Sequence, residues 1–104
     1  MKIILFGDSI TDAGRFLSDA LPYYTYGFGY ARDIASALRW KNCRKYEIIN
    51  KGNSGNKIVN LYERVQADVW NLKPDVLSVL IGVNDVWHMI AHNTGVDLKR
   101  YEKI

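Results

Sequence analysis

The sequence has a single cysteine, Cys43, and no apolar run that approaches the length of a membrane span. One cysteine excludes an internal disulfide and is compatible with a reducing compartment. The first apolar run covers only residues 3–6, which is too short for the hydrophobic part of a secretory signal. These absences predict a soluble cytoplasmic protein with no membrane span.

The sequence also has little net charge, because its 14 basic and 11 acidic residues leave an excess of only +3. So small an excess, without a basic stripe, gives no reason to expect a nucleic-acid partner. The basic residues between positions 39 and 45 are expected to form a solvated helix end, where cations are favoured. At 104 residues, 48% of them hydrophobic, the chain suits one globular domain, residues 1–104, without repeats or linkers.

Three short segments are apolar on both faces, which is typical of strands in a parallel sheet covered by helices. The predicted strands are residues 2–6, 47–50 and 76–83. Apolar residues at helical spacing predict helices between and after these strands. The predicted helices are residues 31–38, 58–72 and a last segment that begins near Val96 and continues to Ile104. The alternation favours an α/β fold with three layers, a flavodoxin-like parallel sheet with helices on both faces.

A long connection, residues 11–28, follows the first predicted strand and is rich in tyrosine, phenylalanine and glycine. Long connections inside compact domains often carry function. The same aromatic residues would also serve if they only covered one end of the sheet. The sequence leaves both interpretations open.

Glycine and small polar residues follow each of the three predicted strands. The segments are residues 7–9, 51–55 and 82–85. Because ligands bind beyond the carboxyl ends of parallel strands, these segments are expected to meet at one edge of the sheet. Asp8, within the first segment, is expected to bond loop amides beside the serine.

Such an edge offers what acyl transfer requires. The hydroxyl of Ser9 can attack a carbonyl carbon. The oxyanion that develops needs donors already in place, and the backbone N–H groups of Ser9 and Gly52 with the side-chain amide of Asn84 are candidates. A glycine at position 52 would let backbone approach the substrate without a side chain between them.

The segments GDS, NKGNSG and GVND resemble, in order, the first three sequence blocks of the SGNH hydrolases, also called the GDSL esterase/lipase family. The resemblance implies a serine ester hydrolase that acts on an acyl or acetyl ester of a carbohydrate, a lipid or a small alcohol. It implies Ser9 as the nucleophile and Gly52 and Asn84 as members of the oxyanion hole. Such enzymes use no cofactor and no metal.

Each of these residues also has a simpler interpretation. Ser9 with Asp12 matches the S-x-x-D pattern of a helix capping box. Gly52 and Gly55 fit a tight turn, and Asn84 fits a helix cap. Only the three blocks together favour the catalytic interpretation.

The family's fourth block, D-x-x-H near the carboxyl terminus, supplies the base, and no such block stands at that place in these 104 residues. We therefore expect the N-terminal part of a longer domain, with little of an esterase's rate on its own. Residues 85–88 spell D-x-x-H but overlap the asparagine block. His88 is thus a weak candidate for a surrogate base, and we expect His88 and His92 to be surface or packing residues.

Two other classes of function remain. One is a non-catalytic α/β module that binds an ester, a carbohydrate or another chain. The other is a flavodoxin-like nucleotide binder, which the lack of a phosphate-cradling loop after the first strand disfavours. The third predicted strand would form an uncharged apolar edge, which predicts self-association or docking of a missing C-terminal half. Alternatively, the helix near Val96 folds over that edge and shields it.

Overall fold

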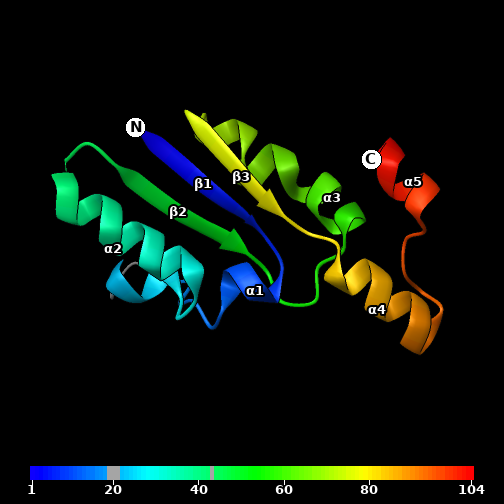
Figure 1. Ribbon diagram of the computed structural model, residues 1–104. Helices are drawn as coiled ribbons and strands as arrows, with labels where there is room; N and C mark the ends of the chain where they lie inside the picture. Colours follow the sequence, from blue (N-terminus) through cyan, green and yellow to red (C-terminus); the bar gives the residue numbers. More distant parts are fainter. Residues whose placement is uncertain (19–21, 43) are drawn as a thin grey trace.

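The computed structural model describes residues 1–18, 22–42 and 44–104 (Figure 1), so Cys43 and part of the aromatic connection lie outside the described residues. Three parallel strands form one sheet in the order β2-β1-β3. They are β1 (Lys2–Gly7), β2 (Glu47–Gly52) and β3 (Val76–Leu80). Gly7 pairs with Gly52 on one side and with Leu80 on the other, so all three strands end at the same level. The predicted α/β fold is confirmed.

One helix covers each face of the sheet, which produces the three predicted layers (Figure 1). Helix α2 (Tyr30–Asn42) covers one face and helix α3 (Ile58–Asp68) the other. Successive residues of β1 point to opposite faces, so each face has its own core. The core on the α2 side contains Leu5, Ala31, Ala35 and Ile48, and the core on the α3 side contains Ile4, Phe6, Leu61 and Val69.

The remaining helical segments are short. They are α1 (Ser9–Asp12), η1 (Pro22–Tyr26), η2 (Trp70–Leu72), α4 (Val83–His92) and α5 (Leu98–Lys103). The segment predicted as one helix over residues 58–72 divides at Val69, whose ψ of −65° and φ of −124° lie outside the helical region. The last helix begins at Leu98, two residues after the predicted start near Val96, because the side chain of Asp97 caps it by accepting a hydrogen bond from the N–H of Arg100.

The prediction of a strand over residues 76–83 was wrong at its carboxyl end. The strand ends at Leu80, and Gly82 turns the chain with a φ of 136° that glycine alone adopts readily. Val83 then begins helix α4, which the sequence analysis did not predict. An unbroken apolar run does not show where a strand gives way to a buried helix turn.

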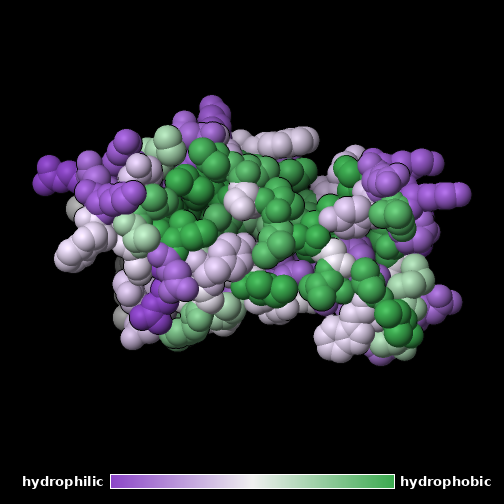
Figure 2. Space-filling view, viewed as in Figure 1, coloured by the Kyte–Doolittle hydropathy of each residue, from purple (hydrophilic) through white to green (hydrophobic). Residues whose placement is uncertain are grey.

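Strand β3 lies at an edge of the sheet, and its apolar residues are exposed. The side chains of Val76, Leu77, Val79 and Leu80 are between 41% and 50% exposed. Figure 2 shows hydrophobic residues gathered over this strand and continuing toward α4. Helix α5 therefore does not shield the edge, contrary to the alternative interpretation. No helix within the described residues is long and apolar enough to cross a membrane.

Candidate active site

The end of β1 carries Asp8 and Ser9, and their roles differ from those of a capping box. Asp8 is buried and is the N-cap of α1, because its carboxylate accepts a hydrogen bond from the N–H of Ile10 at 2.9 Å. Asp8 thus accepts from an amide beside the serine as expected, but this amide belongs to α1 and not to a loop. Ser9 is the first residue of α1 and is exposed, and its hydroxyl makes no hydrogen bond within the described residues. The capping interpretation of Ser9 is therefore wrong, and its hydroxyl is free.

Gly7 precedes this pair because the chain turns tightly from the end of the sheet into α1. A Cβ at Gly7 would lie 2.5 Å from the carbonyl oxygen of Leu80 and 2.5 Å from Oγ1 of Thr11. Any side chain there would push the start of α1 away from the sheet. The glycine two positions before the serine thus holds Ser9 close to the ends of the strands.

Gly52 ends β2, and its backbone N–H is already used. This N–H donates to Oδ1 of Asn50 at 2.8 Å, in a buried position. The side-chain amide of Asn50 in turn donates to the carbonyls of Thr11 and Tyr26. A Cβ at Gly52 would lie 2.2 Å from the backbone nitrogen of Asp12, so the close approach of α1 explains the glycine. The structure brings Gly52 to the predicted edge, but its amide hydrogen is committed to Asn50.

The turn that follows β2 presents a different glycine. The N–H of Asn56 donates to the carbonyl of Asn53 at 3.2 Å, which closes a turn with Gly55 at a φ of 84°. The N–H of Gly55 has no hydrogen-bond partner within the described residues, and the space beside its Cα is open. Gly55 therefore presents an unbonded backbone N–H in this turn, which the sequence analysis did not consider as a donor. The second glycine of NKGNSG was the available signal, and only the backbone conformation separates it from Gly52.

Two arginines, Arg15 and Arg64, hold this turn by hydrogen bonds. Arg15 donates from Nε to the carbonyl of Gly52 at 2.7 Å and from Nη2 to Oδ1 of Asn53 at 2.9 Å. Burial lowers the pKa of Arg15 from its ordinary value, and the nearby carboxylate of Asp12 partly opposes that effect. Asp12 also accepts from the N–H and the hydroxyl of Ser54 at 3.0 Å.

Arg64, on α3, links the turn to β1. It donates to the carbonyl of Gly7 at 3.0 Å, to the carbonyl of Lys51 at 2.9 Å and to Oδ1 of Asn56 at 2.8 Å. Its guanidinium lies 4.5 Å from the centre of the Phe6 ring. One side chain therefore fixes the end of β1 relative to both ends of the turn after β2.

Asn84 and Asp85 connect the third strand end to the same turn. Asn84 is buried, with 4% of its side chain exposed, and donates from Nδ2 to the carbonyl of Asn56 at 3.0 Å. The second hydrogen of that amide has no acceptor within the described residues. Asp85 accepts from the N–H of Ile58 at 3.1 Å, and burial raises the pKa of Asp85 while this hydrogen bond opposes the rise. Neither residue caps its own helix, since the N-cap of α4 is Gly82.

His88 lies on α4, three residues after Asp85. Its ring contacts are with neighbours on the same helix, Trp87 at 6.5 Å and His92 at 5.9 Å between ring centres. His88 is half-buried and His92 is exposed, which supports the interpretation of both histidines as surface or packing residues. The described part of the chain contains no group of three or more histidine, cysteine or acidic residues placed to hold a metal.

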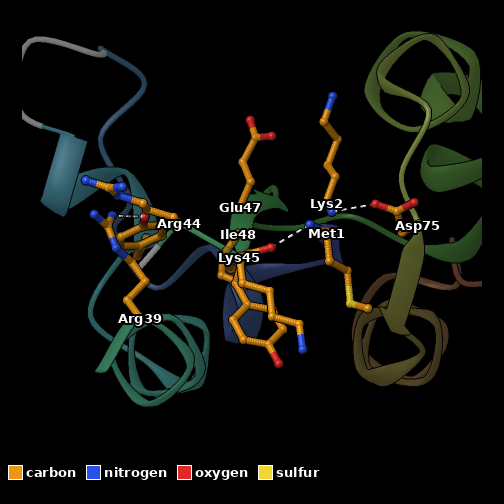
Figure 3. Close-up of a pocket in the computed structure, with 10 residues that line it drawn as sticks. Met1, Lys2, Arg39, Arg44, Lys45, Glu47, Ile48 and Asp75 are labelled. Carbon is orange, nitrogen blue, oxygen red and sulfur yellow. Dashed lines mark hydrogen bonds between the residues drawn. The ribbon is translucent and has the colours of Figure 1, made fainter. Parts of the chain in front are cut away.

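A charged cavity of about 500 Å³ lies at the opposite pole, where the strands begin (Figure 3). The backbone N–H of Lys2 donates to Asp75 at 2.7 Å, and Arg39 donates to the hydroxyl of Tyr26 at 2.8 Å. Arg39 and Lys41 lie in the last turn of α2, as predicted for a basic helix end. The length of the sheet separates this cavity from Ser9.

Comparison with known proteins gives consistent results. The chain matches the GDSL-like Lipase/Acylhydrolase family over residues 5–104. A curated acetylxylan esterase of Geobacillus stearothermophilus is 38% identical over 88 residues, which are 83% of this chain and 40% of that protein. The structure of Axe2, an acetylxylan esterase of the same organism, is similar with a TM-score of 0.88 and 34% sequence identity. The match covers 98% of this chain and 49% of the Axe2 chain. An alpha/beta hydrolase from the metagenome of Lake Arreo, LAE5, has a TM-score of 0.85 at 36% identity, with 98% and 50% covered. The chain spans about half the length of these relatives.

Proposed function

Because this chain belongs to the GDSL-like lipase/acylhydrolase family, we propose that it supplies the nucleophile and the oxyanion donors of a serine ester hydrolase. We further propose that residues 1–104 are the first part of one such domain. The relatives named as acetylxylan esterases favour an acetyl ester of a carbohydrate as the substrate. The observation that carries the proposal is the hydrogen-bonded turn after β2, which joins all three strand ends at the edge where Ser9 is exposed.

Ser9 forms the covalent bond in the proposed reaction. Its Oγ attacks the acetyl carbon, the hydroxyl proton passes to a base, and the carbonyl oxygen becomes an oxyanion. Collapse of this intermediate expels the sugar alcohol, which takes up the proton, and water then hydrolyses the acyl-serine. The donors for the oxyanion are the backbone N–H of Ser9, the free hydrogen of the Asn84 amide and one further backbone N–H.

For this last donor we propose Gly55 in place of Gly52. The N–H of Gly52 is committed to Asn50, whereas the N–H of Gly55 is free and its surroundings are open. An oxyanion at Gly52 would have to displace a buried hydrogen bond, which costs about 1–3 kcal/mol. Donors that are already in place avoid this cost.

The base in this proposal comes from polypeptide outside these 104 residues. His88 contacts the rings on its own helix, and the family's D-x-x-H block has no counterpart at the expected place. Loss of the base from a serine triad lowers kcat on the order of 10⁶-fold, while loss of one oxyanion donor lowers it about 10²- to 10³-fold. The chain alone is therefore expected to be a very slow esterase.

The exposed face of β3 fits the same proposal. In sheets of the order 2-1-3-4-5 a fourth strand pairs with the third. Beside β3 lies an apolar cavity of about 310 Å³, lined among others by Phe6, Leu77, Val79 and Trp70. We propose that the remaining part of the domain, or failing that a second copy of this chain, covers this face.

Hydrolysis of a chromogenic acetate ester tests the proposed function. The chain alone should show a rate barely above background, and addition of a polypeptide with the family's D-x-x-H half should raise it by several orders of magnitude. The Ser9→Ala variant, which changes only an exposed side chain, should stay at background in the mixture. If the mixture binds together but hydrolyses no ester with Ser9 present, the chain is a non-catalytic binding module.

A further inference from the structure

Four aromatic side chains around the start of α2 are exposed and touch one another. They are Phe16, Tyr23, Tyr24 and Phe28, between 39% and 55% exposed, and we call them the aromatic cluster. Tyr24 lies at its centre, with ring centres 5.3 Å from Phe16, 6.0 Å from Phe28 and 6.3 Å from Tyr23. Rings that served only to cover the sheet would be buried, as Tyr26 and Tyr30 partly are against the α2-side core. The aromatic side chains of this region therefore form two groups, one that packs on the sheet and one that is exposed to solvent.

A cation lies against the aromatic cluster. The guanidinium of Arg32 is 4.8 Å from the ring centre of Tyr23 and 5.6 Å from that of Phe28. Hydrogen bonding from Arg32, and then from Ser36, lowers the pKa of Tyr23 from its ordinary value. The cluster therefore combines apolar ring faces with a guanidinium and phenol hydroxyls at its border.

The aromatic cluster is also fixed beside the nucleophile. The N–H of Phe28 donates to the carbonyl of Ala13 at 2.9 Å, directly after α1. A Cβ at Gly27 would lie 2.3 Å from the carbonyl oxygen of Asp12, so this backbone rests on α1 itself. Helix α1 is one turn long and begins with Ser9, so the point where this backbone is anchored lies one helical turn from the serine.

We propose that the aromatic cluster is the platform that binds the sugar rings of the substrate, while the acetyl group faces Ser9. The inference rests on the proposed function, because it assigns the carbohydrate part of that ester to a place. A pyranose ring has C–H faces that pack on aromatic rings and hydroxyl groups at its border that bond to polar groups. The ring faces and the Arg32 border match both features. An acyl chain would need an apolar groove without such a border.

Titration of the 104-residue chain with xylotetraose, followed by two-dimensional NMR, tests this inference. Shifts should concentrate on residues 13–16 and 23–32. Tyr24→Ala should weaken binding about tenfold, and Tyr24→Phe, which keeps the ring, by less than about twofold. The backbone bonds from Phe16 and Gly27 to the carbonyl of Tyr24 do not involve its side chain, so the connection should keep its shape.

Trp40→Ala is the matched control, since this side chain is 92% exposed on α2 outside the aromatic cluster. It should leave the affinity unchanged. If Tyr24→Ala fails to fold, Arg32→Gln provides the second test and should also weaken binding. Absence of saccharide binding, or equal binding by the parent chain and Tyr24→Ala, would overturn the inference.

The outcomes for the platform and for the esterase are separable. Saccharide binding at the aromatic cluster, without any acylation of Ser9 after the D-x-x-H half is added, would contradict the proposed function alone. Acylation of Ser9 without saccharide binding would contradict the platform alone. A dimer that Tyr24→Ala dissociates, with no saccharide bound, would show that the cluster is an interface and overturn the inference.

Discussion

Removal of the Arg64 guanidinium should destabilise the protein more than any surface ion pair does. Arg64→Met keeps an aliphatic side chain over Phe6 but removes the donors to Gly7, Lys51 and Asn56 and the ion pair with Asp68 at 2.6 Å. Each hydrogen bond with a charged partner contributes about 1.5–3 kcal/mol. The Arg64 side chain is still 16% exposed, so water replaces part of the loss. We expect a decrease of about 3 kcal/mol in the free energy of unfolding.

Urea unfolding measures this decrease, with Arg100→Met as the matched control. Arg100 also pairs with an aspartate on its own helix end, at 2.7 Å, but its side chain is 63% exposed. Exposed pairs contribute little to stability, because water and salt screen them. If Arg64→Met does not fold, Arg64→Lys should show an intermediate loss, since lysine keeps the charge but not the fork of donors. Equal losses for Arg64→Met and Arg100→Met would refute the idea that Arg64 fixes the strand ends.

Three further predictions follow from the same contacts. Gly52→Ala should lower the melting temperature far more than Gly55→Ala. The new Cβ at position 52 would lie 2.2 Å from the backbone of Asp12. Position 55 faces open space, so the alanine there costs only about 1 kcal/mol for its φ of 84°. Burial raises the pKa of Asp85 above its ordinary value of 3.8. The contribution of this carboxyl group to the free energy of unfolding is therefore fully present below pH 3.8 and is lost as pH rises through the raised pKa. Asp85→Asn keeps an acceptor for Ile58 and should flatten this part of the stability–pH curve; a curve that matches the parent would contradict the assignment. Light scattering at micromolar concentration should detect self-association through β3, which Val79→Lys should abolish, and a monomeric parent chain would exclude pairing at that edge.

The sheet was predictable from the sequence because its strands carry local signals. β1 and β2 are apolar on both faces and are bounded by glycine and polar residues, which also located Ser9 and Gly52 at strand ends. The boundary between β3 and α4 was not predictable, because the apolar run continues through Gly82 while the chain changes direction. No local pattern tells a free glycine N–H from a bonded one. The difference between Gly52 and Gly55 therefore became visible only with the hydrogen bond to Asn50.

Capping was ambiguous for a similar reason. Asp8 and Ser9 are adjacent, and both residue types are common N-caps. The carboxylate of Asp8 accepts the N–H of Ile10, in a turn where a Cβ at Gly7 would clash with Leu80 and Thr11. The sequence contains both candidates but not the tertiary contact that decides between them.

Labelling of the chain with a serine-directed fluorophosphonate, read by mass spectrometry of the modified peptide, tests most directly whether Ser9 is the nucleophile of an oxyanion site. The account predicts slow labelling at Ser9, because no base activates it, with no adduct in Ser9→Ala and an unchanged rate in His88→Ala. Asn84→Ala should slow the labelling about 10²-fold or more, since the oxyanion-like phosphoryl oxygen loses a donor. Adducts at other serines, or rapid labelling that His88→Ala abolishes, would contradict the account.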